Sequence, residues 1–244
     1  MENKNNLMNY PVFPGKLQDI SITDSLQVIH TINAYSYVLA ERIPSFKTAL
    51  QKADILLADG FPIVFAAKIL QKKNITKLAG ADLFFYLLTE MEKRKGRIFF
   101  LGSSKTTLSL IKNKIAEDYP NCIVDTFSPA FKPVFSEEDS EKMLSKINAF
   151  VPDIVFVGMT APKQEMWVEV FKNRINAKAV CSIGAVFDFY SGTIKRAPKW
   201  LILLKLEWFY RLINEPKRMW KRYLIYSPLF FWDLLLYLFR LKKK

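Results

Sequence analysis

The feature that most constrains the fold is a regular alternation between short apolar runs and longer amphipathic stretches. The apolar runs have the length and composition of buried strands and cover residues 27–32, 55–58, 97–101, 122–126, 154–157 and 179–183. The amphipathic stretches between them have helical length and cover residues 63–72, 81–95, 105–118, 137–150 and 163–173. Strands that alternate with helices form parallel βαβ units. We therefore expect an α/β fold, with a Rossmann-like, mostly parallel sheet and helices on both faces.

The alternation stops near residue 197, where a basic and aromatic-rich segment begins. Residues 195–244 carry 13 Lys or Arg against three acids, so they hold +10 of the chain's net charge of +13. Their companions are apolar and aromatic, which is typical of membrane binding, whereas nucleic-acid readers pair their charge with polar side chains. We expect an α/β core over 1–196 and a helical membrane-binding appendage over 197–244, with no nucleic-acid partner.

Residues 223–241 of the appendage are nearly long enough to cross a bilayer, which takes about 20 apolar residues. Pro228 interrupts this run early, and Asp233 lies near its middle, where a charge opposes insertion. We therefore expect a helix that lies in the interface of an anionic membrane. The side chains expected to enter the acyl boundary are Phe230, Phe231, Leu234, Leu235 and Leu238. The alternative is a final helix that packs on the core or on a second copy of the chain.

The start of the chain has neither the positive charge nor the apolar stretch of a secretory signal. We expect a cytosolic protein that binds peripherally to the cytoplasmic face of the membrane.

Cys122 and Cys181 lack the spacing of a zinc site or a redox motif, which favours buried thiols. His30, the only histidine, lies inside an apolar run, which favours a structural role and leaves little material for His-based catalysis.

Open parallel sheets bind ligands where their strands end, so the residues after each apolar run are the candidate site. Gly102 and Ser103 open a helix whose N-terminus favours a phosphate, although many α/β turns of this kind bind nothing. Asp59 follows the run 55–58 and is either a general base or the N-cap of the next helix. Thr31 and Asn33 end the first run.

Seven motifs in a fixed order carry a resemblance to a known family. They are Asp59-Gly60, Gly80-Ala81-Asp82-Leu83, the Gly102-Ser103 turn, Pro162-Lys163-Gln164-Glu165, Gly184-Ala185-Val186-Phe187-Asp188, Arg196-Ala197-Pro198, and residues 207–212 with Glu215-Pro216-Lys217-Arg218. Over 21–223 the chain resembles the WecG/TagA/CpsF family, glycosyltransferase family 26. The resemblance implies an inverting transferase that moves a sugar, often N-acetylmannosamine or its uronic acid, from a UDP-sugar donor to an undecaprenyl-diphosphate-linked acceptor. Such enzymes serve teichoic acid, enterobacterial common antigen, capsule or exopolysaccharide synthesis.

The resemblance also implies roles for single residues. It makes Asp59 the candidate base, puts Thr31 and Asn33 in the same pocket and gives Gln164 a contact with the donor. Arg211, Arg218 and Lys221 or Arg222 match the basic residues of the family's C-terminal appendage, which would neutralise a diphosphate. The remaining substrate-binding candidates are Lys77, Gly102, Ser103, Asp188 and Arg196.

This sequence departs from the family pattern in three places. Lys77 stands where Arg is usual, residues 78–81 read Leu-Ala-Gly-Ala in place of Val-Thr-Gly-Ser, and Thr160-Ala161 replaces a Gly-Thr pair. All three lie near the predicted pocket, so they bear on sugar specificity more than on the reaction.

No Asp-x-Asp pair, the usual metal clamp on a nucleotide-sugar diphosphate, occurs in the chain. We therefore expect a metal-independent enzyme without a cofactor. Two alternatives remain. A nucleotide-dependent oxidoreductase would share the core but should carry the glycine fingerprint, which is absent. A non-catalytic, membrane-associated nucleotide-binding scaffold would share the basic tail but leaves Asp59 and Gln164 unexplained. A homo-oligomer is compatible with the sequence.

Overall fold

The computed structural model describes residues 5–194, 198, 201 and 207–242. Within this part of the chain, eight strands form one sheet in the order β1-β2-β4-β3-β8-β7-β5-β6. Their bounds are β1 Asn5–Leu7, β2 Tyr10–Val12, β3 Gln27–Ile32, β4 Ile55–Ala58, β5 Arg97–Gly102, β6 Ile123–Phe127, β7 Ile154–Gly158 and β8 Ala179–Ser182. β1 and β2 are antiparallel, and every other neighbouring pair is parallel. The predicted α/β fold with a mostly parallel sheet is confirmed.

Helices follow the strands as the periodicity predicts. In the described residues they are α1 Ala34–Ala40, α2 Pro44–Gln51, α3 Phe61–Gln71, α4 Gly80–Arg94, α5 Lys105–Asp118, α6 Glu137–Phe150, α7 Lys163–Phe171, α8 Val186–Ser191, α10 Glu207–Asn214, α11 Pro216–Lys221 and α12 Ser227–Lys242. Short 3-10 turns are η1 Leu17–Asp19 and η2 Lys172–Arg174, and η3 Arg222–Tyr226 is a π-helical turn. The sequence pattern does not predict β1, β2, α1, α2 or α8, because each is too short to show a clear period.

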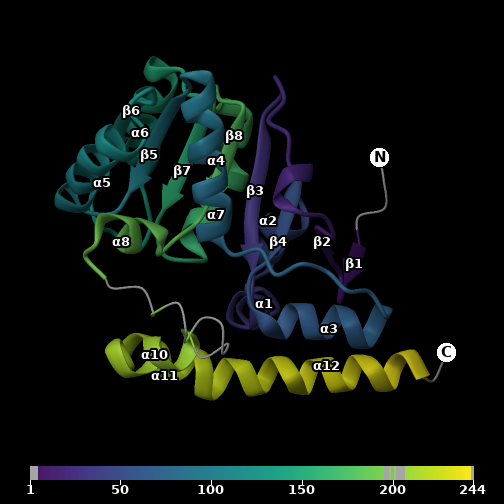
Figure 1. Cartoon of the computed structure of the whole chain (residues 1–244). Helices are drawn as coiled ribbons and strands as arrows, with labels where there is room; N and C mark the ends of the chain where they lie inside the picture. Colours follow the sequence, from purple (N-terminus) through teal and green to yellow (C-terminus); the bar gives the residue numbers. More distant parts are fainter. Residues whose placement is uncertain (1–4, 195–197, 199–200, 202–206, 243–244) are drawn as a thin grey trace.

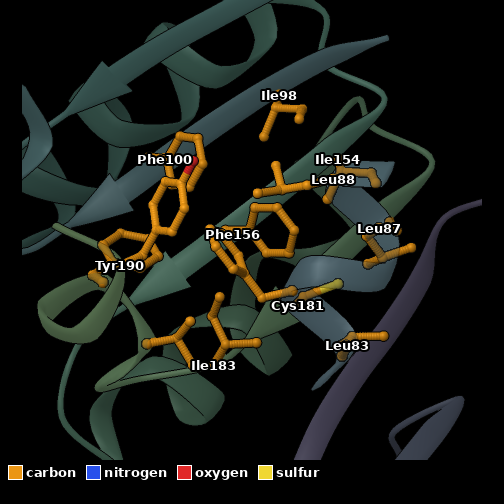
Figure 2. Packing of buried hydrophobic residues seen from close by; sticks show 14 of the residues in the cluster. Leu83, Leu87, Leu88, Ile98, Phe100, Ile154, Phe156, Cys181, Ile183 and Tyr190 are labelled. Carbon is orange, nitrogen blue, oxygen red and sulfur yellow. The ribbon is translucent and has the colours of Figure 1, made fainter. Parts of the chain in front are cut away.

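Helices cover both faces of the sheet. In β7, Ile154 and Phe156 pack in the cluster under α4, α5 and α8, while Val155 and Val157 pack in the cluster under α6 and α7. This alternation follows from the two-residue period of a strand. Figure 2 shows the first cluster, in which the rings of Phe100 and Phe156 lie with their centres 5.5 Å apart. Two buried strand faces explain why the strands read as continuous apolar runs rather than alternating ones.

The sheet changes winding direction between β5 and β7. The connection from β5 runs outward to β6, whereas the connection from β7 runs back toward β8. Gly102 and Gly158 face each other where these two strands end. A Cβ atom on Gly102, whose φ is +111°, would lie 2.5 Å from the Gly158 carbonyl oxygen. Close backbone approach at this point therefore requires glycine, and such switch points are where open α/β sheets bind ligands.

The last helix packs on the core. α12 runs beneath α1 and α3, and Phe230 and Leu234 lie in the same buried cluster as Tyr37 of α1 (Figure 1). The expectation that Phe230 and Leu234 enter a membrane is therefore wrong, because these two residues, four apart on one helical face, meet the protein. Their neighbours Phe231 and Leu235 remain 39% and 42% exposed.

No helix in the described ranges is both long and apolar enough to cross a bilayer. The expected boundary at residues 196 and 197 lies outside the described residues. The division into a core and an appendage therefore stays a prediction.

Phe230→Ala should lower the free energy of unfolding by about 3–5 kcal/mol, because it empties a fully buried site between α12 and α1. Phe239→Ala, the same change on the same helix at a residue that is 56% exposed, should change it by about 0.5 kcal/mol or less. Urea unfolding followed by circular dichroism measures both. Equal losses would show that α12 does not share the core.

Candidate active site

The carboxyl ends of the parallel strands point toward the side of the molecule where α8, α10, α11 and α12 lie (Figure 1). Asp59 directly follows β4, and its backbone N–H donates to the Ile32 carbonyl oxygen at the end of β3 (2.9 Å). Gly60, at φ +110°, is the N-cap of α3, and no side chain caps that helix. The alternative that Asp59 is an N-cap is therefore wrong, which leaves its carboxylate at the sheet edge without a capping role.

Arg222, near the end of the chain, lies close enough to Asp59 for the two charges to interact. It is partly buried at the start of η3, with its guanidinium carbon 4.7 Å from the centre of the Tyr35 ring of α1. Burial lowers the pKa of Arg222, the nearby Arg211 lowers it further, and the charge of Asp59 counteracts both. The interaction with Asp59 joins residues 163 positions apart, so the folded tail completes the site.

Gln164 and Glu165 lie buried in the first turn of α7, after β7. The Gln164 side chain accepts from the Met159 backbone N–H (3.1 Å) and donates to Glu165 Oε1 (2.8 Å). Burial raises the pKa of Glu165 to about 7, although the hydrogen bond from Gln164 and the charge of Arg222 both oppose this rise. Gln164 thus holds the strand-end loop in shape, and Glu165 adds a second carboxylate near Arg222.

A second group of charges joins α8 to α10 and α11. Burial raises the pKa of Asp188, while Arg218 and Arg211 lower it and Glu215 raises it. The Arg211 guanidinium carbon lies 5.3 Å from the centre of the Phe189 ring. Its Nε and Nη2 atoms are buried without a hydrogen-bond partner among the described residues. These two N–H groups are therefore available to donate hydrogen bonds to an anionic ligand.

The remaining predicted residues are dispersed around the edge. Asn33 is the N-cap of α1. Its Oδ1 accepts a hydrogen bond from the Ser36 backbone N–H (3.0 Å) and therefore already has a structural partner. Thr31 is partly buried in β3. Lys77 is exposed in a loop tied to the end of β4, where the Leu78 N–H donates to the Ala58 carbonyl oxygen (2.9 Å).

Lys221 is exposed, with its Nζ 5.5 Å from the centre of the Trp220 ring, and it points to no carboxylate of the edge in the contacts of the described residues. Of the two alternatives Lys221 and Arg222, the structure brings Arg222 into the group with Asp59. Arg218 is exposed and pairs with Glu215 at 3.0 Å. Arg196 lies outside the described residues.

The Gly102-Ser103 turn lies at the switch between β5 and β7. Ser103 adopts φ +59°, and its carbonyl oxygen accepts from the Ser128 hydroxyl (2.7 Å). Ser104 caps the 14-residue helix α5 by accepting from the Thr107 backbone N–H (3.1 Å). A helix N-terminus at a switch point suits a phosphate group.

Two features of the site escape a sequence-based reading. Tyr35 supplies the ring on which Arg222 lies, but nothing in its local sequence marks it, because the contact joins distant segments. Glu165 is visible as a charged residue at a strand end, but only its burial distinguishes it from a surface acid. His30 is buried in β3, and burial lowers its pKa to about 3, which agrees with the predicted structural role.

An α/β protein whose carboxylates and guanidinium groups meet at the carboxyl edge of the sheet has the layout of an enzyme for phosphate-bearing substrates. The sequence profile described as "Glycosyl transferase WecG/TagA/CpsF family" matches residues 8–244. The chain belongs to this family and is a glycosyltransferase.

Two relatives are named N-acetylglucosaminyldiphosphoundecaprenol N-acetyl-beta-D-mannosaminyltransferase. The protein from Bacillus spizizenii is 33% identical over 181 residues, which cover 74% of this chain and 68% of the relative. The protein from Bacillus subtilis is 33% identical over 197 residues, which cover 81% of this chain and 75% of the relative. The resemblance read from the seven motifs is confirmed, and neither the oxidoreductase nor the non-catalytic scaffold finds support.

Proposed function

We propose that this glycosyltransferase moves N-acetylmannosamine from a UDP-linked donor to N-acetylglucosamine carried on undecaprenyl diphosphate, with inversion at the anomeric carbon. The names of the two Bacillus relatives support this choice of sugar and acceptor. The observation that carries the proposal is the position of Asp59 directly after β4, at the sheet edge, where its charge interacts with that of Arg222 of the tail. A base and a cation at one sheet edge are what a direct displacement with an anionic leaving group needs.

In this mechanism Asp59 removes the proton from the acceptor hydroxyl while the oxygen attacks the anomeric carbon. The bond from that carbon to the UDP oxygen breaks in the same step, and negative charge grows on the diphosphate. Arg211, Arg222 and the N-terminus of α5 would stabilise this charge, since preorganised donors and cations need no reorganisation as the reaction proceeds. A positioned base contributes about 10²- to 10⁴-fold to such a step.

Asp59→Asn should bind UDP as the wild type does, while kcat falls by about 10²-fold or more, because the amide is similar in shape but cannot accept the proton. Transfer is measured by mass spectrometry with UDP-N-acetylmannosamine and a short prenyl-diphosphate-linked N-acetylglucosamine. Asp125→Asn, on the edge strand β6, is the matched control and should keep wild-type turnover. If Asp59→Asn turns over at a near-normal rate, Asp59 is not the base, and if the wild type uses other UDP-sugars in preference, the proposed donor is wrong.

The proposal includes independence from divalent metal ions. The cations gathered near the strand ends, Arg211, Arg218 and Arg222, can neutralise the diphosphate themselves, and Arg suits this task because its donors form a planar fork. In that arrangement a bound Mg²⁺ would duplicate charge that the protein already supplies.

Transfer should therefore continue at more than about half its rate in excess EDTA, because guanidinium groups rather than a metal ion carry the leaving-group charge. The measurement is the same mass-spectrometric assay with and without chelator. Complete loss of transfer that Mg²⁺ or Mn²⁺ restores would contradict this part of the proposal.

We further propose that the outer face of α12 and the adjacent α3 bind the cytoplasmic face of an anionic membrane. Phe231 of α12 and Phe65 of α3 contact each other with ring centres 6.1 Å apart, so the two helices share one apolar surface. The exposed residues of this surface are Phe61, Ile69, Phe231, Trp232, Leu235, Leu236 and Phe239. Basic residues of the tail accompany it, as in peripheral membrane proteins.

Replacing Phe231 and Leu235 together by Ser should lower partition onto phosphatidylglycerol vesicles by about tenfold or more, because two partly exposed side chains lose about 2 kcal/mol of burial in the membrane. Sedimentation with vesicles measures the effect. Phe131→Ser is the control, since Phe131 is 99% exposed in the segment between β6 and α6 and belongs to neither α3 nor α12. Unchanged sedimentation of the double variant would overturn this orientation.

A further inference from the structure

Glu165 is a buried acid for which the mechanism above has no use. Glu165 lies in the first turn of α7 and is only 2% exposed. One carboxylate oxygen, Oε1, accepts from Gln164 Nε2 at 2.8 Å. The other oxygen, Oε2, is buried and has no hydrogen-bond partner in the part of the chain that the structure describes. Burying a carboxylate costs free energy unless it is paired, so a buried acid with an unpaired oxygen suggests a role beyond packing.

Arg222 is a cation near Glu165, but it makes no hydrogen bond to the carboxylate among the described residues, and burial outweighs its effect on the Glu165 pKa. It interacts electrostatically with Glu165 of α7 on one hand and with Asp59 of β4 on the other. Arg211 opposes this arrangement, because its like charge lies close enough to lower the pKa of Arg222. The charges of Asp59 and Glu165 therefore attract Arg222, while that of Arg211 repels it.

We propose that Glu165 is a positioning residue: in its ionised form it holds Arg222 and the Gln164 amide in the arrangement that receives the donor diphosphate. This inference rests on the proposed function for what the site binds. Glu165 itself makes no contact with substrate in this account, since it is buried and accepts a hydrogen bond from Gln164. Its position in the first turn of α7 also favours the ionised form, because the helix dipole is positive there.

The protonation of Glu165 should change in the neutral range. Burial raises its pKa to about 7. Three titratable groups on neighbouring elements move away from this range: burial lowers the pKa of His30 of β3 to about 3 and raises the pKa values of Tyr35 of α1 and Cys181 of β8. Burial also raises the pKa of Asp188 of α8, which Arg218 and Arg211 oppose. Two lysines beside α7, Lys52 after α2 and Lys172 of η2, pair with Glu169 at 3.4 and 2.7 Å.

The first test compares pH profiles of kcat/KM for transfer. In the wild type, kcat/KM should rise about tenfold per pH unit below pH 7 and level off above it, because the ionised fraction of Glu165 limits the competent enzyme. Glu165→Gln should lose this acid limb and be about 10²-fold less active at pH 8, as expected when positioning of a reacting group is lost.

Glu169→Gln is the matched control: the same change, four residues further along α7, at an acid that pairs with Lys172. It should keep the wild-type profile. A Glu165→Gln variant that retains the limb, or that has wild-type activity at pH 8, would overturn the assignment.

The second test does not depend on transfer. The pKa of Glu165 rises from 4.5 in the unfolded chain to about 7 in the fold. Between these values the unfolded state loses its proton while the folded state keeps it, so the wild type loses stability as pH rises to about 7. The melting temperature of Glu165→Gln relative to the wild type should therefore increase from pH 5 to pH 8.

If Glu165 only stabilised the fold, Glu165→Gln would be less stable and less active together at every pH. A difference in melting temperature that does not change with pH would overturn the inference. If the wild type transfers no sugar at all, the proposed function fails. The melting series still shows whether ionisation of Glu165 destabilises the fold.

Discussion

The site depends on the packing of α12 into the core. Phe230 and Leu234 are buried against α1, and each such side chain contributes about 1.5–3 kcal/mol when it leaves water. The π-helical turn that begins with Arg222 directly precedes this helix. Because α12 is anchored, Arg222 is held where its charge interacts with that of Asp59, although Arg211 repels it. Hydrophobic burial thus offsets the electrostatic cost of concentrating positive charge at one place.

The winding of the sheet decides where that charge is useful. The strands β5 and β7 diverge in their connections, and Gly102 lies against the Gly158 carbonyl where they end. Ser104 and the first residues of α5 are exposed next to this approach, and α10 and α11 lie on the side of the molecule where the strands end (Figure 1). A diphosphate bound there would meet both a helix N-terminus and guanidinium groups.

Buried carboxylates near this edge are a cost to the fold. The pKa of Glu165 is raised to about 7, and that of Asp188 is also raised by burial. Burial disfavours the charged form of both acids, yet both lie near guanidinium groups of the tail. Clusters of charged groups at functional sites commonly lower the stability of the protein, because their charges are arranged to bind a ligand.

The sequence by itself determined the parallel sheet, the strand ends at which Asp59 and Gln164 lie, and the family, because two-sided burial produces continuous apolar runs and ordered motifs are local. Only the tertiary structure decided that Gly60 rather than Asp59 caps α3, that Asn33 caps α1, and that Phe230 faces the core. It also decided that Tyr35 supports Arg222. These outcomes depend on contacts between segments far apart in the chain and on which side of a helix meets the protein, and neither is encoded in local periodicity.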